Sequence, residues 1–235
     1  MPDRFYGAGL PGVSISGLGG ILVALEGADG SGRSTQIRLL KDWLERRGHA
    51  VAEVGLRRST LVARELSAAK EGHTLGHLTM SLFYAADFAD QLEHVIVPAL
   101  RAGYIVLADR YIYTLMARDI VRGADSGYLE RLYGMALVPD AVYYLRVSPR
   151  ILIERNLQKS GALDYWESGM DIGLASDMLD SFVKYQTLMG AQFKQLQERY
   201  GFEVVNGNRT VRSVSNDLRA RIEAKLGATL SAIAP

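Results

Sequence analysis

The chain has 235 residues, of which 48% are hydrophobic and 23% are charged, and its formal net charge is +1. This size suits one globular domain with a full core, and the near-neutral charge excludes a global field that would attract nucleic acid or a membrane. The absence of cysteine excludes disulfides, thiolate metal sites and a cysteine nucleophile, and fits a cytoplasmic protein.

The stretch "GVSISGLGGILVAL" (12–25) is apolar, like the core of a signal peptide, but glycines are scattered through it. Asp3 precedes the apolar part, and no small-residue cleavage site follows it. We therefore interpret residues 1–20 as a structural arm that leads into a single domain over residues 21–235. No stretch of about 18 apolar residues occurs, so no membrane span is expected.

The remaining chain alternates between short apolar runs, typical of buried strands, and amphipathic stretches, typical of helices. Strands are expected at residues 21–26, 50–54, 104–109, 140–147 and 202–206. Helices are expected at 35–48, over most of 60–102 with a break near 72–76, and at 111–122, 127–137, 149–159 and 209–227. This alternation predicts an α/β fold with a five-stranded parallel sheet flanked by helices. We assign the aromatic and methionine stripe of Phe182, Tyr185, Met189 and Phe193 to the core.

A glycine-rich loop, "EGADGSGRSTQ", joins the first strand to the first helix. It follows the phosphate-loop pattern G-x-x-x-x-G-K-[ST], except that Arg33 replaces the lysine. Backbone N–H groups and the helix N-terminus form an anion cradle, Ser34 offers a hydroxyl for Mg²⁺, and Arg33 offers a cation for the β- and γ-phosphates of ATP. The expected nucleotide-binding residues are Gly27, Gly30, Ser31, Gly32, Arg33, Ser34 and Thr35. A purely structural glycine turn is the alternative.

The third strand ends in "LADRYIYT", which places Asp109 and Arg110 at the carboxyl edge of the sheet. Parallel sheets bind their ligands at this edge, so the two residues should lie beside the glycine loop. The Asp109 carboxylate can hold Mg²⁺ or its water shell, and Arg110 can bind a second phosphate. A surface Asp-Arg pair is the simpler alternative.

These features together resemble the thymidylate kinase family of P-loop nucleoside monophosphate kinases, from about residue 20 to the C-terminus. The glycine loop is similar to the family's opening motif. The stretch "LFYAADFADQLEHVIVPALRAGYIVLADRYIYT" (82–114) is similar to its acceptor helix, third strand and Asp-Arg-Tyr motif, and "PDAVYYLRV" (139–147) to its fourth strand. The resemblance implies that kinase fold, with a lid at about residues 160–173.

The resemblance also implies roles for single residues. Asp29 would face the acceptor sugar, Arg110 the acceptor phosphate, and Tyr84 would stack on the base. Arg155 would add positive charge from the helix before the lid, so that the expected catalytic set is Arg33, Asp29, Asp109, Arg110 and Arg155. The apolar face of residues 128–138 suggests a homodimer interface or, equally, part of the core.

The acceptor half of the site departs from the family pattern. Phe88 stands where the family has an arginine that reads thymine, Arg118 replaces a tyrosine, and Asp119 replaces an amide. Arg57 and Arg58 lie in a segment that replaces the family's Arg-Glu-Pro. We include Phe88, Arg118, Asp119 and Arg58 in the substrate site. Lost donors at Phe88 predict that dTMP is not the best acceptor, unless Arg118, Arg57 or Arg58 restores them.

The sequence thus predicts an ATP- and Mg²⁺-dependent phosphotransferase that acts on a nucleoside monophosphate, dTMP or a related nucleotide, in nucleotide biosynthesis. The alternatives are a deoxynucleoside kinase with Asp29 or Asp119 as base, and a non-catalytic nucleotide-binding protein. Neither nucleic acid nor membrane is expected as a partner.

Overall fold

A computed structural model of the protein describes residues 4–72 and 75–233 and contains one five-stranded sheet. All strand pairs are parallel and the strand order is β2-β3-β1-β4-β5. The strands are β1 (Ile21–Glu26), β2 (Val51–Gly55), β3 (Ile105–Asp109), β4 (Ala141–Arg146) and β5 (Glu203–Asn206). The predicted α/β fold with a five-stranded parallel sheet is confirmed.

The strand register brings the predicted functional segments together. Asp109, the last residue of β3, pairs with Leu25 of β1 on one side and with Gly55 of β2 on the other. The glycine loop begins two residues after Leu25, and both segments leave the sheet at its carboxyl edge. The positions of the loop and of Asp109 are therefore fixed by backbone pairing.

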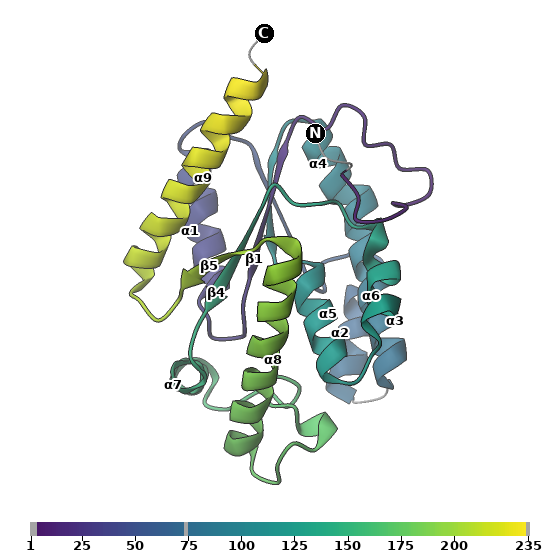
Figure 1. The fold of residues 1–235 in the computed structure, drawn as a ribbon, viewed down its shortest axis with the longest axis vertical. Coiled ribbons are helices and arrows are strands. Elements are labelled where there is room, and N and C mark those ends of the chain that lie inside the picture. Colours follow the sequence, from purple (N-terminus) through teal and green to yellow (C-terminus); the bar gives the residue numbers. More distant parts are fainter. Residues whose placement is uncertain (1–3, 73–74, 234–235) are drawn as a thin grey trace.

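Helices cover both faces of the sheet (Figure 1). On one face lie α1 (Arg33–Glu45) and α9 (Val211–Ile233), which pack on each other and on the sheet through buried aliphatic side chains. The other face is covered by α3 (His77–Gln91), α4 (Val97–Arg101), α5 (Ile112–Val121), α6 (Ser126–Leu132) and α8 (Met178–Tyr200). Helix α2 (Ala63–Gly72) packs on α3, and α7 (Pro149–Ser160) follows β4 and packs on α8.

The long helix α8 packs against α5 and supplies much of the core on its face of the sheet. All four residues of the predicted apolar stripe, Phe182, Tyr185, Met189 and Phe193, are buried. They recur at intervals of three or four residues, so one side of the helix faces the core. Their assignment to the core is confirmed.

Several helix boundaries differ from the prediction. The helical stretch expected over 60–102 consists of α2, α3, a π-helical turn at Leu92–Ile96 and α4; residues 73 and 74, inside the predicted break, lie outside the described part of the chain. The π-helical turn precedes Pro98, which has no N–H and whose ring clashes with the carbonyl of a regular α-helix. Helix α6 ends at Leu132, earlier than predicted, and a 3₁₀ turn (Tyr133–Met135) follows it.

The N-terminal arm packs against the segment between α6 and β4 (Figure 1). Phe5 forms an isolated bridge with Leu137, and the Tyr6 amide donates to the Ala136 carbonyl at 2.9 Å. These contacts lie on the α6 side of the sheet, and the Tyr6 hydroxyl also bonds that of Tyr113. In the described part of the chain, no helix is both long enough and apolar enough to span a membrane.

Candidate active site

The glycine loop has a backbone that only glycine adopts easily. Gly30 and Gly32 have φ angles of 82° and 89°, in the left-handed region. A Cβ atom at Gly27 would lie 2.8 Å from Ser31 Oγ, so a side chain cannot be added there without a shift. Ser31 Oγ is buried and has no hydrogen-bond partner among the described residues. The loop thus has the shape and a spare donor for an anion in front of α1.

The Arg33 guanidinium lies inside the loop and is almost fully buried. Its Nε donates to Asp109, and its Nη1 donates to the carbonyls of Gly27 and Ala28. Burial, and then the charge of Arg110, lower the pKa of Arg33. Arg33 therefore closes the loop against the end of β3 and provides positive charge where phosphates would bind.

Asp109 joins Arg33 to Ser34, whose Oγ donates to Asp109 Oδ2 at 2.9 Å. Burial would raise the pKa of Asp109, but the charge of Arg33 and the hydrogen bonds from Arg33 and Ser34 outweigh it and lower the pKa. A hydroxyl and an ionised carboxylate in contact suit Mg²⁺, which binds few protein ligands and keeps water and substrate phosphates as the others. No cluster of three or more acidic or histidine ligands occurs among the described residues.

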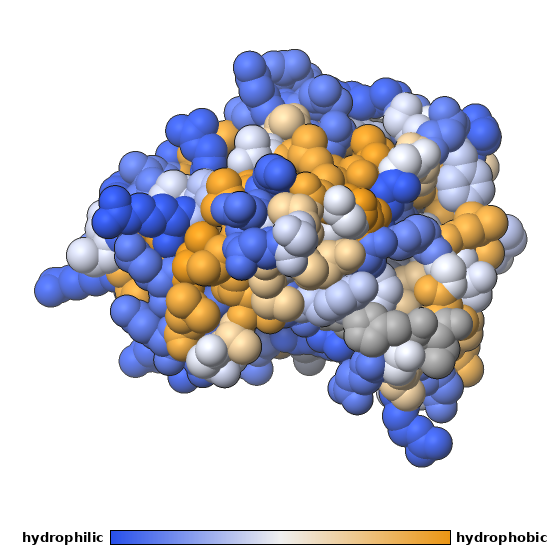
Figure 2. All heavy atoms as spheres, turned by 90° about the horizontal axis from the view of Figure 1, so that it is seen from below, coloured by the Kyte–Doolittle hydropathy of each residue, from blue (hydrophilic) through white to orange (hydrophobic). Residues whose placement is uncertain are grey.

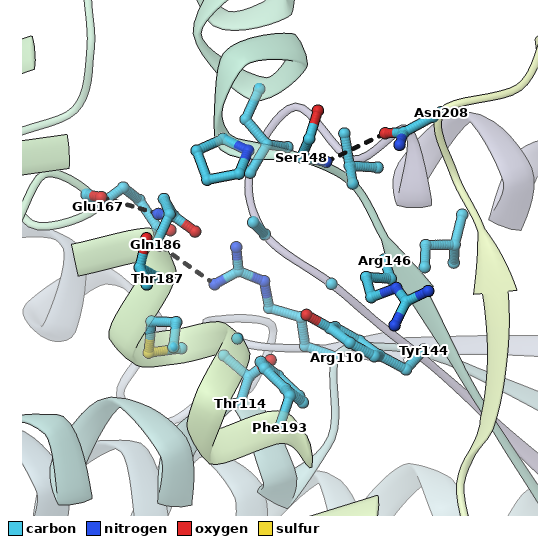
Figure 3. Close-up of a pocket in the computed structure, with 18 of the residues that line it drawn as sticks. Arg110, Thr114, Tyr144, Arg146, Ser148, Glu167, Gln186, Thr187, Phe193 and Asn208 are labelled. Atoms are coloured by element: carbon cyan, nitrogen blue, oxygen red, sulfur yellow. Dashed lines mark hydrogen bonds and ion pairs between the residues drawn. The ribbon is translucent and has the colours of Figure 1, made fainter. Parts of the chain in front are cut away.

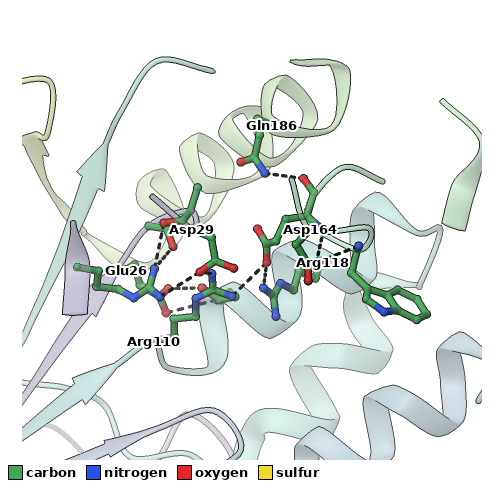
Figure 4. A network of polar contacts seen from close by, with 12 residues as sticks. Glu26, Asp29, Arg110, Arg118, Asp164 and Gln186 are labelled. Atoms are coloured by element: carbon green, nitrogen blue, oxygen red, sulfur yellow. Dashed lines mark hydrogen bonds and ion pairs between the residues drawn. The ribbon is translucent and has the colours of Figure 1, made fainter. Parts of the chain in front are cut away.

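Arg110 lies next to the loop in an uncommon backbone conformation, with a φ of 73°. Its Nη2 donates to Asp29 Oδ1 at 2.8 Å, and its Nη1 lies 3.5 Å from Glu167 Oε1. Burial would lower the pKa of Arg110, but Asp29, Glu26 and Asp109 raise it. The guanidinium is therefore charged and held between Asp29 of the loop and Glu167. Figure 4 shows Arg110 and Asp29 in this network of polar contacts.

Glu26, the last residue of β1, fixes the chain on either side of Arg110. Its Oε1 accepts from the amides of Tyr111 at 2.9 Å and Thr114 at 3.3 Å, and its Oε2 accepts from the Thr114 hydroxyl. Tyr111 cannot cap α5 with its own side chain, so Glu26 satisfies the free amides of the first turn. Glu26 is fully buried, and burial raises its pKa. We did not identify Glu26 from the sequence.

A cavity of about 170 Å³ opens between the glycine loop, the end of β3 and the segment after β2. Its charged lining has five arginines against two aspartates, Asp29 and Asp109, so it carries a positive charge that suits phosphate. The arginines are Arg33, Arg57, Arg58, Arg110 and Arg118.

A smaller, mostly apolar pocket of about 50 Å³ adjoins the arginine cavity, because Tyr84 and Arg118 line both. Asp119 also lines it and accepts from Ser81 Oγ at 2.6 Å, and Trp166 closes it from the predicted lid. Burial raises the pKa of Asp119. The two cavities together have the form of a site for a flat ring joined to an anion.

Phe88 does not line either of these cavities, contrary to the expectation from the sequence. It is 5% exposed and packs edge-on against Tyr111 and Tyr133, with ring centroids 5.1 and 6.4 Å away. An apolar ring is more stable in this aromatic core than beside five charged groups. The apolar face of residues 128–138 also packs inward, through Leu129 and Leu137, and is core rather than a free interface.

The predicted lid is tied to the site by ion pairs. Glu167 accepts from Arg118, and Asp171 pairs with Arg122, whose Nε lies 2.7 Å from Asp171 Oδ2. Gly161, Gly169 and Gly173 in this segment all have positive φ. Glu167 and Asp171 were not identified from the sequence, although the acidic residues of this segment, Asp164, Glu167 and Asp171, were a signal.

Arg155 lies behind the glycine loop rather than in the arginine cavity. Its Nη1 is 3.3 Å from the carbonyls of Gly30 and Ser31, and its Nη2 donates to the Gly207 carbonyl at 3.0 Å. Arg155 thus connects the loop to the turn after β5. Of the other predicted nucleotide-binding residues, Thr35 is half-buried in the first turn of α1.

Two polar residues of α3 position the segment that carries Arg57 and Arg58. Asp87 accepts from the amides of Arg57 at 2.7 Å and Ser59 at 3.0 Å, and Gln91 bonds both backbone groups of Gly55. Arg58 then lies 3.8 Å from Asp109. This segment could not be aligned with the family pattern from the sequence alone, and its position depends on contacts with α3.

Comparison with known proteins adds to this geometry. Residues 25–170 match the family model described as "Thymidylate kinase". The "Probable thymidylate kinase 2" of Saccharolobus solfataricus is 37% identical over 201 residues, which cover 85% of this chain and 94% of that protein. The "Probable thymidylate kinase" of Thermococcus kodakarensis is 30% identical over 88% of this chain and 99% of its own length. The "Thymidylate kinase" of Gloeobacter violaceus is 35% identical over 60% of this chain and 69% of its own length.

Proposed function

Because the chain belongs to the thymidylate kinase family, we propose that it transfers the γ-phosphoryl group of ATP to dTMP. The observation that carries this proposal is the arginine cavity, which joins a glycine loop on one side to a pocket with an aromatic wall on the other. Such an arrangement suits two phosphate-bearing substrates that meet end to end.

Transfer in this site depends on position and charge. The acceptor phosphate oxygen attacks the γ-phosphorus of ATP, a new P–O bond forms, and the bond to the β-phosphate oxygen breaks to release ADP. The nucleophile is already an anion, so no general base is needed. Arg110 would hold the acceptor phosphate, and Arg33 would neutralise charge on the transferred group.

Mg²⁺ would be held through the Ser34 hydroxyl and the Asp109 carboxylate, with phosphate oxygens and water as its other ligands. When bound, it neutralises charge on the β- and γ-phosphates. Arg33 and Ser34 bind different oxygens of the Asp109 carboxylate, so Arg33 would add its positive charge next to the Mg²⁺ position.

The nucleobase would lie in the small pocket, stacked on Tyr84. Arg118 lines both the arginine cavity and this pocket, so its guanidinium can supply donors to thymine carbonyls that an arginine at position 88 would otherwise provide. Arg57 and Arg58 also reach the arginine cavity. These positions support dTMP as the acceptor, against the expectation from Phe88 that dTMP is not the best one.

A nucleoside kinase would need a carboxylate free to accept a proton from a hydroxyl. Asp29, the nearest candidate to the loop, is paired with Arg110 at 2.8 Å, and Asp119 is bonded to Ser81. An acceptor cavity with five arginines also suits a phosphate better than a neutral hydroxyl. The monophosphate kinase is therefore the better-supported reaction.

We also propose that the protein is a homodimer that buries part of α3. Leu78 and Leu82 lie one turn apart on this helix and are 62% and 47% exposed. Two large aliphatic side chains on one helical face favour contact with an apolar partner surface.

The test is ADP formation with Mg-ATP and a panel of dTMP, dUMP, dCMP, dGMP, AMP and thymidine. We expect the highest kcat/KM with dTMP. A higher value with thymidine would identify a nucleoside kinase. ATP binding without turnover of any acceptor would identify a non-catalytic nucleotide-binding protein.

A further inference from the structure

A third, larger cavity is lined by Arg110, Arg118 and Glu167, of which Arg110 and Arg118 also line the arginine cavity. It has a volume of about 450 Å³ and lies between α8, the ends of β4 and β5, and the beginning of α7 (Figure 3). This volume is within the range of small-molecule sites. It shares Gly27 and Ala28 with the glycine loop, and Arg110 and Arg118 with the arginine cavity. Its remaining wall, which includes Tyr144, Arg146 and Phe193, belongs to neither the proposed donor site nor the proposed acceptor site.

The lining of this cavity is positively charged. Arg110, Arg118 and Arg146 line it, whereas Glu167 is its only acidic lining residue among the described residues and is already paired with Arg118. Figure 3 shows the Arg110 guanidinium pointing into the middle of the cavity. The Arg146 side chain has no hydrogen-bond or ion-pair partner among the described residues. The cavity therefore favours an anion.

One wall of the cavity is aromatic. Tyr144 and Phe193 stack with ring centroids 4.5 Å apart and an interplanar angle of 11°. Both rings line the cavity, and Tyr144 is only partly buried. A flat ring can pack against this wall while an attached anion reaches Arg146 or Arg110.

Gly190 keeps the cavity open. It lies in the middle of α8, where glycine is a poor helix former, and a Cβ atom there would meet no other atom within 4 Å. A side chain at this position would therefore begin in the space of the cavity that Gly190 lines. Helix α8 thus has glycine, the poorest helix former apart from proline, at a position that lines the cavity.

We propose that this cavity binds a nucleoside phosphate as an effector, distinct from the two reacting nucleotides. Arg110 and Arg118 belong to the walls of both this cavity and the acceptor cavity. An anion that attracts Arg110 here weakens its hold on the acceptor phosphate, so occupancy raises the KM for the acceptor. Only this effect on KM rests on the proposed function; the binding itself does not.

The experiment measures binding to the full chain by calorimetry with the donor and acceptor sites blocked. A bisubstrate analogue, adenosine and thymidine joined by a polyphosphate, is added to saturation, and dTTP or pyrophosphate is then titrated. We expect one further binding event for dTTP and at least tenfold weaker binding of pyrophosphate, because pyrophosphate has no ring for the aromatic wall. No further dTTP event, or equal affinity for pyrophosphate, would overturn the proposal.

Matched variants locate the event. Gly190→Leu fills the cavity and should abolish dTTP binding, whereas Gly227→Leu, also helical and also facing open space, should leave it unchanged. Arg146→Gln should weaken binding about tenfold, as expected for one lost charged hydrogen bond. Arg150→Gln, at an exposed arginine on α7, is its control. Unchanged affinity for the bisubstrate analogue shows that each variant is folded, and dTTP binding that survives both Gly190→Leu and Arg146→Gln refutes this location.

Discussion

Replacement of Arg33 by methionine tests whether the arginine of the glycine loop is integral to the site. In the structure its guanidinium is paired with Asp109, and the two side chains are 8% and 9% exposed. Removal of one partner from a buried ion pair costs about 3–5 kcal/mol, because the other charge stays buried without compensation. Ser34 and Arg58 remain near Asp109, so we expect the lower end of this range, about 3 kcal/mol.

The pH dependence of this loss has a definite sign. The pKa of Asp109 is lower in the folded protein than in the unfolded chain. Its ionised form therefore stabilises the fold at any pH above the pKa of the unfolded chain, and this stabilisation is lost as the pH falls through the folded pKa. The destabilisation by Arg33→Met should therefore be complete at pH 7 and shrink below about pH 4. The double variant that combines Arg33→Met with Asp109→Asn should be about 2 kcal/mol more stable than the sum of the two single destabilisations predicts.

Urea unfolding followed by circular dichroism at pH 7 measures these free energies for the wild type, the two single variants and the double variant. Calorimetric titration with Mg-ATP measures the functional part. Loss of one charged hydrogen bond to phosphate predicts about tenfold to hundredfold weaker binding in Arg33→Met and a smaller loss in Arg33→Lys. A destabilisation below about 1 kcal/mol together with unchanged Mg-ATP affinity would refute the reasoning for Arg33.

Three further predictions concern other parts of the molecule. Burial raises the pKa of Glu26, so the wild type loses stability as the pH rises through the folded pKa of this carboxyl. Glu26→Gln cannot ionise and should therefore melt at a higher temperature than the wild type, by a margin that grows from pH 4 to pH 8. A margin independent of pH would contradict this. Residues 160–173 should be cleaved by protease more slowly with the bisubstrate analogue than without it, and identical cleavage patterns would argue against a mobile lid. Leu82→Glu should convert the proposed dimer to a monomer in light scattering, whereas the exposed Leu61→Glu on the loop before α2 should not.

The parts of the site that the sequence predicted are those that follow strands directly. The glycine loop and Asp109 come immediately after apolar runs, and a parallel sheet aligns the ends of such runs. Glu26, the last residue of β1, was not identified as a site residue, because its role depends on amides at positions 111 and 114, about 85 residues along the chain. Single-sequence periodicity contains no information on that contact.

Phe88 shows a different limit of sequence reasoning. Its alignment position indicated the substrate site, but position along a helix does not determine which neighbours a side chain meets. Beside it in sequence, Asp87 holds the backbone of Arg57 and Ser59, and it thereby directs the arginine-bearing segment to the acceptor cavity. Charges from that segment and from Arg118 surround the cavity instead of an arginine on α3.

The capping of α5 by Glu26 also affects which parts of the site can be substituted independently. The glycine loop and Arg110 are both attached to the end of β1. The loop continues directly from the strand. Arg110 is attached through its own amide, which donates to the Leu25 carbonyl at 3.0 Å, and through the next residue, whose amide donates to the Glu26 carboxylate. The register of β1 and β3 therefore sets where the glycine loop begins relative to Arg110. Side chains on α3 and in the lid can be exchanged to admit another base while the start of the glycine loop relative to Arg110 stays the same, which makes the base pocket the natural target for redesign.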